Sequence, residues 1–508
     1  MLQERLRALT RDTLRGMRRG IEKESLRTRR DGTLALTPHP PALGSALTHP
    51  HITTDFSESQ LELITGTHDT VDACLEELTH IHQFVLHAID GESLWAGSMP
   101  CVLPAEQDIP IGRYGNSNVG RAKTVYRQGL AWRYGRRMQT ISGIHYNWSM
   151  PGLGNAEYFA LIRNFRRHGW LLLYLFGASP AVCSSFVDGR PHRLQPLAPG
   201  TLFQPHATSL RMGRLGYQSD AQASLAVLCN DLESYGATLQ RGLTQVYPPY
   251  EVIGLREPGV EGDGPESYRQ LSTTLLQIEN EFYGKIRPKR PIHQGERPLH
   301  ALRERGVEYV EVRLMDLDPH AAVGITAPVM RFLDTFLLHC LLTDSPPDTP
   351  EDVECVARNQ ECVAARGREP GLRIGCGSQD RDLREWGEQL IAECAPVAEA
   401  LDAAFGGHGY RDAQAAQLAV VRDASLAPSA RVLADLGRHN SSYRDFARAQ
   451  SDLHRQALRA LPFPSDAEAR FARLASESIA EQRAIEAADS LPFEEYRKRY
   501  LAVERLGI

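Results

Sequence analysis

Residues 309–314 read Tyr-Val-Glu-Val-Arg-Leu, so polar and apolar side chains alternate at every position. Successive side chains of a β-strand point to opposite faces of the sheet, which places Tyr309, Glu311 and Arg313 on one face. The two valines and the leucine between them occupy the other face. The stretch therefore predicts a strand with one polar and one buried face.

The same spacing recurs in two earlier stretches of the chain. In residues 19–27 (RGIEKESLR), Glu22 and Glu24 are two positions apart and share a strand face. In residues 143–149 (GIHYNWS), His145 and Asn147 lie opposite large apolar side chains. Both stretches are thus predicted to add acidic or imidazole groups to the polar face of a sheet.

Residues 53–65 (TTDFSESQLELIT) add Asp55 and Glu62, which flank a short linker between apolar positions. If these segments form one sheet, its polar face gathers carboxylates and one imidazole: Glu22, Glu24, Asp55, Glu62, His145 and Glu311. Crowded carboxylates cannot all stay ionised without counter-charge. Oxygen ligands with one imidazole suit Mg²⁺ or Mn²⁺ better than zinc, and such ions bridge phosphates to a substrate carboxylate. Arg313 is a natural partner for a transferred phosphoryl group.

Spacing alone leaves a simpler interpretation open. An E-x-E pair on an amphipathic strand is more often a solvated face, and a single histidine in a strand is more often structural. The segment 115–121 imitates a P-loop but lacks its Lys and Ser/Thr, and no G-x-S-x-G, H-E-x-x-H or G-x-G-x-x-G occurs. Segment 286–290 (IRPKR) is too short for nucleic acid, and it either binds phosphate or is simply solvated.

Helical periodicity appears in several segments, and the longest fill the last third of the chain. We predict helices in residues 2–19, 70–90, 155–176, 381–404 and 466–488. On the second of these, we expect His80, His82 and His87 to lie at the surface. A Pro/Asp-rich connector at about residue 345 separates a sheet-containing core, residues 1–345, from a mainly helical part, residues 346–508, of one catalytic unit. The fold class is α+β.

Composition excludes several classes of protein. The net charge is −6, so the chain lacks the basic field expected of a nucleic-acid-binding protein. No apolar segment reaches the length of about 20 residues that a membrane-spanning helix needs, and the N-terminus lacks a signal-peptide core. We therefore expect a cytoplasmic protein. The sequence does not fix the oligomeric state, and a monomer is the working expectation.

The cysteines predict neither a disulfide framework nor a zinc site. Their number, nine, is odd, and no C-x-x-C occurs in this long chain. We expect reduced, buried thiols that act as small apolar side chains. The set is Cys74, Cys101, Cys183, Cys229, Cys340, Cys355, Cys362, Cys376 and Cys394.

Taken in order, longer motifs carry a family resemblance. The series includes RGIEKESLR (19–27), GSALTHPHITTDFSESQLELIT (44–65), SMPC (98–101), YGNSNVGRAKTVYRQGL (114–130), MQTISGIHYNWSMP (138–151), YLFGASPAVCSSF (174–186), ATSLRMGRLGY (207–217), LQIENEFYGKIRPKR (276–290) and GVEYVEVRLMDLDP (306–319). Together they closely resemble the bacterial glutamate–cysteine ligases (γ-glutamylcysteine synthetases) of the proteobacterial monofunctional type. The resemblance is dense from about residue 15 to 345 and weaker beyond, where PGLRIG and SARVL are similar to the family.

The resemblance implies a curved, mainly antiparallel, funnel-like sheet of the glutamine synthetase/carboxylate–amine ligase type, surrounded by helices. It implies an ATP-dependent reaction in which the γ-carboxylate of L-glutamate is phosphorylated and the amine of L-cysteine displaces phosphate. The product is γ-glutamylcysteine, formed in the first step of glutathione biosynthesis. Because no covalent enzyme intermediate is needed, catalysis rests on positioning and charge neutralisation.

Site residues carried over from the family fall into three groups. The metal ligands, for two or three Mg²⁺ ions that Mn²⁺ can replace, are Glu22, Glu24, Asp55, Glu62, His145 and Glu311. The catalytic residues are Glu311 and Arg313, the latter as the phosphoryl-stabilising arginine. The residues of the cysteine pocket are Phe56, Tyr126, Leu130, Arg211, Tyr217 and Tyr283. Aromatic walls suit a thiol, and Arg211 can pair with a carboxylate.

Two departures from the family pattern affect details of the amino-acid pocket. Segment 151–158 (PGLGNAEY) is short, and Pro205 and His206 stand where a tyrosine-like residue is expected near position 206. No second ligase module follows residue 508, so we expect the enzyme without the glycine-adding function. The alternatives are a glutamate ligase for another amine, a non-catalytic relative that binds nucleotide or glutathione, and a structural metal protein. The presence of Glu22, Glu311 and Arg313 weighs against the non-catalytic relative, and a structural metal protein would not explain Arg313 or the aromatic pocket.

Overall fold

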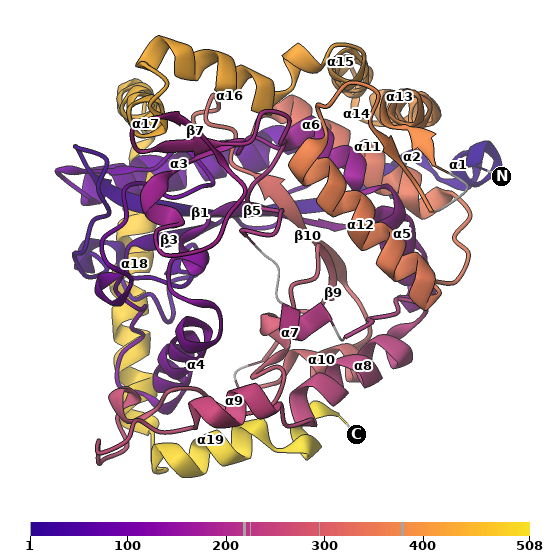
Figure 1. Ribbon diagram of the computed structural model, residues 1–508. Helices are drawn as coiled ribbons and strands as arrows, with labels where there is room; N and C mark the ends of the chain where they lie inside the picture. Colours follow the sequence, from indigo (N-terminus) through magenta and orange to yellow (C-terminus); the bar gives the residue numbers. More distant parts are fainter. Residues whose placement is uncertain (1, 217–219, 224, 294, 377–379, 508) are drawn as a thin grey trace.

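A mostly antiparallel sheet lies at the centre of the computed structural model, which describes residues 2–216, 220–223, 225–293, 295–376 and 380–507 (Figure 1). It is seven-stranded, in the order β2-β3-β1-β5-β10-β9, with β4 paired to β1 off this path. The strands are β1 (Arg18–Arg29), β2 (Ile52–Thr54), β3 (Gln60–Ile64), β4 (Glu92–Leu94), β5 (Gly143–Ser149), β9 (Ile286–Lys289) and β10 (Tyr309–Asp316). Every named pair in this sheet is antiparallel.

The alternation of side chains gives the sheet two different faces. Ile21, Tyr146, Trp148, Val310 and Val312 all point to one face and are completely buried. Helices α3 (Val71–Ala88), α6 (Trp170–Phe176) and α11 (Ala327–Leu342) lie above the sheet in Figure 1, and α5 (Asn155–His168) packs beside β9 and β10. Burial of these side chains fixes the register, because a shift of one residue would turn the apolar set towards the opposite face.

Helices of the first two thirds cover both sides of the sheet. They are α1 (Leu2–Ala8), α2 (Arg11–Arg15), α3 (Val71–Ala88), α4 (Asn118–Tyr134), α5 (Asn155–His168), α6 (Trp170–Phe176), α7 (Asp220–Ala223), α8 (Leu232–Thr244), α9 (Pro248–Ile253), α10 (Pro298–Arg305) and α11 (Ala327–Leu342). A separate three-stranded sheet has the order β6-β8-β7, formed by β6 (Ala181–Cys183), β7 (Gln195–Ala198) and β8 (Thr201–Phe203).

The last third is helical, as predicted, and wraps around the sheet-containing part (Figure 1). Its helices are α12 (Pro350–Arg366), α13 (Leu383–Glu393), α14 (Ala395–Phe405), α15 (Gly409–Arg422), α16 (Pro428–Leu436), α17 (Tyr443–Ala460), α18 (Ser465–Ala488) and α19 (Phe493–Leu501). A short pair, β11 (Arg373–Ile374) and β12 (Arg381–Asp382), interrupts them. Helix α19 returns to the side of the sheet on which α4 lies.

Three predicted helices differ in extent from those observed. The segment 2–19 is two short helices and the start of β1, because the Thr10 side chain caps a new helix by accepting from the Thr13 amide. A break at Gly169 divides the segment 155–176. The segment 381–404 begins as β12 and breaks at Cys394, which is followed by Pro396 at the start of α14.

The predicted surface position of His82 is wrong. His82 lies on the buried face of α3, with only 1% of its surface exposed, and its Nε2 is 2.9 Å from the Lys23 amine. Lys23 points away from Glu22 and Glu24 into this helix layer. His87 is exposed, as predicted. Helical periodicity places a histidine on a face, but only the tertiary structure shows what covers that face.

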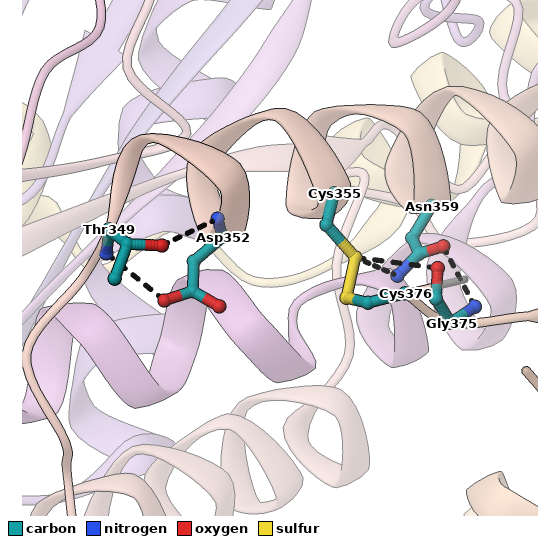
Figure 2. Close-up of a disulfide and its surroundings, with 6 residues drawn as sticks. All are labelled: Thr349, Asp352, Cys355, Asn359, Gly375 and Cys376. Carbon is teal, nitrogen blue, oxygen red and sulfur yellow. Dashed lines mark hydrogen bonds between the residues drawn. A yellow bond between two sulfur atoms is a disulfide. The ribbon is translucent and has the colours of Figure 1, made fainter. Parts of the chain in front are cut away.

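The prediction that all cysteines are reduced is also wrong. Cys355 on α12 and Cys376 form a disulfide across 21 positions of sequence (Figure 2). The separation matches no short cysteine motif, so spacing could not reveal it. The thiols of the seven other cysteines are free, and all of these are buried except Cys362, which is partly exposed.

The α+β fold class with an antiparallel sheet and surrounding helices is confirmed. The largest described cluster of buried apolar side chains includes Leu14 and Leu506 and joins the sheet to the C-terminal helices, and two smaller clusters lie apart from it. The division at about residue 345 stays a prediction. Among the residues that the structure describes, no helix has the length and apolar character needed to cross a membrane.

Candidate active site

The cross-strand register brings the predicted acidic residues to one face of the sheet. Glu22 of β1 lies opposite His145 of β5, and Glu24 of β1 lies opposite Glu62 of β3. On the next strand, Glu311 of β10 lies opposite Asn147. Directly opposed residues of an antiparallel pair point to the same face, so three neighbouring pairs form one polar surface.

Contacts on this surface centre on His145. Its Nδ1 lies 3.0 Å from Glu22 Oε2, and its Nε2 lies 3.5 Å from Glu24 Oε1. The Asn147 amide donates to the other Glu22 oxygen at 3.0 Å. Glu24 also accepts from the Gly143 amide at 2.7 Å and is 1% exposed. Glu24 therefore lies beneath the surface, and Glu22 lies at it.

Glu311 is held between two cations. Lys289 Nζ lies 3.1 Å from one carboxylate oxygen, and Arg313 NH1 donates to the other at 3.0 Å. The first oxygen, Oε1, is buried and accepts no well-aligned hydrogen bond from the described residues. Glu22, His145 and Glu311 each offer one ligand atom, and these atoms lie within 4.8 Å of one another.

Burial and neighbouring charges shift the acidic groups in different directions. Burial, with Asp55, raises the pKa of Glu24 to about 8. Burial, with Glu22 and Asp55, also raises the pKa of Glu62 well above its usual range. Burial opposes ionisation of Glu311, but Lys289 and Arg313 outweigh it and hold the pKa of that carboxyl well below its usual range. The site therefore combines an ionised carboxylate with carboxyls that need further positive charge to ionise.

His145 is set up as a neutral ligand. Burial and the Arg313 guanidinium lower the pKa of His145. For Glu22, burial and the Glu311 carboxylate raise the pKa, but the hydrogen bond to His145 outweighs them, and the pKa lies below its usual range. A neutral imidazole beside ionised carboxylates is a set of ligands suited to a metal ion, whereas an ion pair would need a protonated imidazole.

The polar surface forms one wall of a cavity of about 400 Å³. Glu22, Asp55, Glu62, His145 and Glu311 line it, and so does Arg313. Glu24 is absent from the lining because the wall covers it. The opposite walls come from α4, the segment around residues 278–298 and α19.

Further cations line this cavity in addition to Arg313. They are Lys123 and Arg127 of α4, and Arg287 and Lys289 of β9. Burial and Arg127 lower the pKa of Lys123 to about 8, and burial and Arg313 lower that of Arg287 to about 10. Both side chains stay protonated at neutral pH, so the cavity holds cations beside its carboxylates. Such a mixture is suited to an anionic ligand with bound cations.

The predicted cysteine-pocket residues divide into three groups. Tyr126, Leu130 and Tyr283 line the cavity. Phe56 is fully buried, and Arg211, 1% exposed, donates to the Arg313 carbonyl at 3.0 Å, so both lie behind the lining. Tyr217 lies outside the described residues.

Gly143 explains how Arg211 fits behind the sheet. A side chain at position 143 would place its Cβ within 2.0 Å of the Arg211 guanidinium. The glycine therefore leaves room for an arginine that also lies 3.8 Å from Asp316. Any larger residue would force the guanidinium away from β10.

Some lining residues escaped the sequence analysis. Lys123 and Arg127 lie one helical turn apart on α4, and Tyr496 and Tyr500 lie one turn apart on α19. The two tyrosine rings are stacked, with centroids 6.0 Å apart. The four-residue spacing within each pair can be read from the sequence and predicts a shared helix face. It does not predict that this face lines a cavity.

Comparison with known proteins identifies the family. The model of the family described as glutamate-cysteine ligase matches residues 4–363. The chain belongs to the glutamate–cysteine ligase family. The prediction of this family, and with it of an enzyme, is confirmed.

Relatives in the glutamate–cysteine ligase family match almost the whole chain. The glutamate–cysteine ligase of Azotobacter vinelandii is 48% identical over 96% of this chain and 95% of its own length. That of Pseudomonas aeruginosa is 47% identical over 95% of this chain and 94% of its own. These proteobacterial relatives carry the resemblance past residue 345, where motifs in the sequence are sparse.

Solved structures agree. The glutamate–cysteine ligase of Francisella tularensis, in complex with AMP, has a TM-score of 0.90 and 36% identity and covers 96% of this chain and 97% of its own. A bifunctional glutathione synthetase from Pasteurella multocida has a TM-score of 0.68 and 25% identity over 90% of this chain and 54% of that one. The ligase fold thus extends from the sheet to the C-terminal helices.

Proposed function

We propose that this chain joins the γ-carboxylate of L-glutamate to the amine of L-cysteine with consumption of ATP, in the cavity bounded by Glu22, His145 and Glu311. The reaction forms γ-glutamyl phosphate, which the amine then converts to γ-glutamylcysteine with release of phosphate. The observation that carries the proposal is the single cavity that combines a carboxylate–imidazole wall with five cations, namely Lys123, Arg127, Arg287, Lys289 and Arg313. Family membership defines the reaction class.

The donor set fits Mg²⁺, with Mn²⁺ as a substitute. Glu22, His145 and Glu311 would hold one ion, since their ligand atoms converge and Glu311 Oε1 is buried without an aligned hydrogen bond. Asp55 and Glu62 line the same wall, and Glu24 orients His145 from behind. Bound cations would supply charge neutralisation for the nucleotide phosphates and the glutamate carboxylate. We propose two or three ions in all.

The arginine and lysine side chains stabilise the transferred phosphoryl group. Arg313 projects from β10 beside Glu311, and Lys289 approaches from the neighbouring strand. Glu311 keeps both cations fixed at about 3 Å before substrate arrives. Preorganised positive charge stabilises the phosphoryl oxygens without a reorganisation step, which is the main requirement of phosphoryl transfer.

Tyr126, Leu130 and Tyr283 form the binding site for cysteine. Tyr283 is oriented by Gln139, whose amide donates to its hydroxyl at 3.1 Å. Aromatic and aliphatic walls bind the CH₂–SH group of cysteine and exclude water from the acyl phosphate. Arg211 donates to the Arg313 carbonyl behind the lining, and Phe56 packs behind the wall in the core. The family resemblance adds Tyr217 to the proposed cysteine site.

We assign the opposite end of the cavity to the nucleotide base. Tyr496 and Tyr500 line the cavity together with Ile292 and Pro298, so part of its lining is apolar and aromatic. Planar bases stack on aromatic rings. Tyr496→Ala is expected to raise KM for ATP about tenfold, while KM for cysteine stays within about twofold. Equal changes in both KM values would show that the ring acts through the fold.

Magnesium-dependent ADP release with glutamate tests the reaction. Cysteine is compared with alanine, 2-aminobutyrate, putrescine and no amine, and the product is identified by mass spectrometry. Strongest release with cysteine, with γ-glutamylcysteine formed, supports the proposal. Stronger release with another amine would support the ligase reaction but contradict the assignment of the pocket to cysteine. No release with any amine from folded protein would favour a non-catalytic relative.

The compartment and oligomeric state stay predictions. We propose a cytoplasmic monomer. Sedimentation of the purified chain over a wide concentration range checks the second part, and a constant mass near 56.6 kDa is the expected result. A concentration-dependent rise in mass would contradict it.

A further inference from the structure

A second cavity, of about 190 Å³, lies on the far side of the Tyr283–Ile286 segment from the candidate active site. Helix α12 forms one wall through Val353, Val356 and Ala357, and Val227 and Ile286 contribute to the other walls. Val353 and Val356 are partly exposed and Ala357 is exposed. The cavity is therefore a groove open to solvent, which we call the α12 groove. None of the reaction's proposed groups except Tyr283 lies in its lining.

The polar part of the α12 groove carries positive charge. Lys285 and Arg166 both line it, and no Asp or Glu does so among the described residues. Arg166 pairs with Asp348 at 2.9 Å, a carboxylate that it shares with Arg167 at 3.0 Å. The Lys285 amine donates to Gln360, a neutral amide, and no described carboxylate lies within ion-pair distance of it. Lys285 is thus a partly buried cation whose hydrogen-bond partner, a neutral amide, cannot balance its charge.

The protonation of Lys285 agrees with this geometry. Burial and the Arg166 guanidinium lower the pKa of the Lys285 amine to about 8. The amine is still mainly protonated at neutral pH, and an anion placed beside it would recover the charge interaction lost on burial. A carboxylate is the complementary group of matching size.

The remainder of the groove is apolar and of limited volume. Leu225, Val227, Ile286 and the two valines of α12 surround it. A protein cavity of about 150 Å³ holds benzene, so a volume of about 190 Å³ fits a ring or a branched chain with one carboxylate. A nucleotide or a tripeptide would extend beyond the groove into solvent.

The α12 wall is fixed in place at the start of the helix and within the stretch that lines the groove. At the start of the helix, Thr349 and Asp352 form a reciprocal capping box, which Figure 2 shows together with the disulfide. Cys355, between the lining valines, is bonded to Cys376. The groove therefore exists before any ligand arrives, which lowers the cost of binding.

The groove also touches the proposed cysteine site. Tyr283 lines both cavities, so a ligand in one contacts the back of a residue that faces the other. The Arg313 amide donates to the Lys285 carbonyl at 2.9 Å, which links the residue that carries this partly buried cation to the catalytic strand. A shift of Lys285 towards an anion would be transmitted to both residues.

We propose that the α12 groove is a binding site for a small monocarboxylate with a phenyl-sized or branched apolar body, and that its occupant changes the affinity for cysteine. The second clause rests on the proposed function, whereas the first does not. Lys285 binds the carboxylate, the valines of α12 pack against the apolar body, and Tyr283 carries the effect to the active site.

Benzoate is the probe for binding. Its binding is measured by saturation-transfer NMR with full-length protein in the presence of saturating glutamate and magnesium ADP. Benzyl alcohol, of similar shape without charge, serves as the comparison ligand. Ala357→Trp fills the groove from an exposed position, and Lys285→Met removes the charge at similar length. Arg358→Trp adds the same ring at an exposed position of α12 outside the lining and is the matched control.

We expect benzoate to bind at least about tenfold more tightly than benzyl alcohol, and both groove variants to weaken it by about tenfold or more. Arg358→Trp should bind it like the parent chain. Equal binding of the two ligands, or benzoate binding unchanged in Ala357→Trp and Lys285→Met, would overturn the site. A KM for cysteine that benzoate leaves unchanged would overturn only the coupling, because the NMR measurement needs no turnover.

Discussion

Single residues in the active site combine two tasks that depend on one another. Glu311 is a candidate metal ligand, and it also holds Lys289 and Arg313 on either side. Its carboxylate is 1% exposed and stays ionised because of those cations. Removing the charge would therefore leave two cations in a buried site without their common partner.

Glu311→Gln is expected to lower kcat for ADP release by at least about 100-fold, because it removes a ligand charge and the fixed position of Arg313. Steady-state kinetics and thermal unfolding are measured together. Glu308→Gln is the matched control, since Glu308 lies three residues earlier, pairs with Arg290 and is half exposed. Near-normal turnover in Glu311→Gln would contradict the metal assignment.

Elements are tied to one another by a few polar contacts at their exposed edges. Glu77 of α3 lies 2.7 Å from His68 Nε2, accepts from the Gly66 amide at 2.6 Å, and pairs with Arg470 of α18 at 2.9 Å. Burial raises the pKa of Glu77, but these partners outweigh it and lower the value to about 2. The carboxylate thereby joins α3, α18 and the segment that follows β3.

The second prediction follows from the sign of this shift. A folded-state pKa below the unfolded value of about 4.3 means that Glu77 stabilises the fold above that pH, and that this contribution is lost as the pH falls towards 2. We expect Glu77→Gln to lower the free energy of unfolding by about 2 kcal/mol at neutral pH, a value that allows for solvent screening around Arg470. Between about pH 6 and pH 3, the variant should lose correspondingly less free energy of unfolding than the parent chain does. Urea unfolding at each pH measures both, with Glu76→Gln as the exposed neighbour control.

The third prediction concerns α12. The disulfide between Cys355 and Cys376 closes a loop of 21 residues, which restricts the unfolded chain. Cys376→Ser is expected to lower the free energy of unfolding by about 3 kcal/mol. Thermal unfolding with and without reductant measures the effect, and reductant should destabilise the parent chain but not the variant. A parent chain that reductant leaves unaffected would show that the bond contributes nothing.

The whole molecule is joined through a buried charge pair behind the catalytic sheet. Arg19 of β1 lies 3.0 Å from Asp334 of α11, and both side chains are fully buried. Tyr146 of β5 and Tyr410 of α15 donate to the same carboxylate at 2.8 and 3.3 Å. One carboxylate thus connects two strands of the active site to the C-terminal helices.

Asp334→Leu alone is expected to cost about 3 kcal/mol or more, because it leaves the Arg19 guanidinium buried and unpaired. Adding Arg19→Met should restore much of that loss, since both charges are then gone. Chemical unfolding of the two single variants and the double variant gives the coupling energy. Additive losses would show that the two side chains act independently.

Several features followed from the sequence by itself. Alternation in residues 309–314 and in residues 19–27 predicted strands with one polar face, and the observed pairing places Glu22, Glu24 and Glu311 on it. Alternation works because the two-residue period of a strand is local and needs no knowledge of its neighbours. The ordered series of motifs likewise predicted the family, which the comparisons confirmed.

Only the tertiary structure decided which of these faces meet. Tyr496 and Tyr500 come from the end of the chain to line the cavity, and Arg211 lies behind β10 rather than in the lining. His82 is buried against Lys23, and Cys355 forms a disulfide with Cys376 although their spacing matches no cysteine motif. These contacts depend on how helices and strands far apart in sequence pack together, and periodicity fixes the face of an element but not its partner.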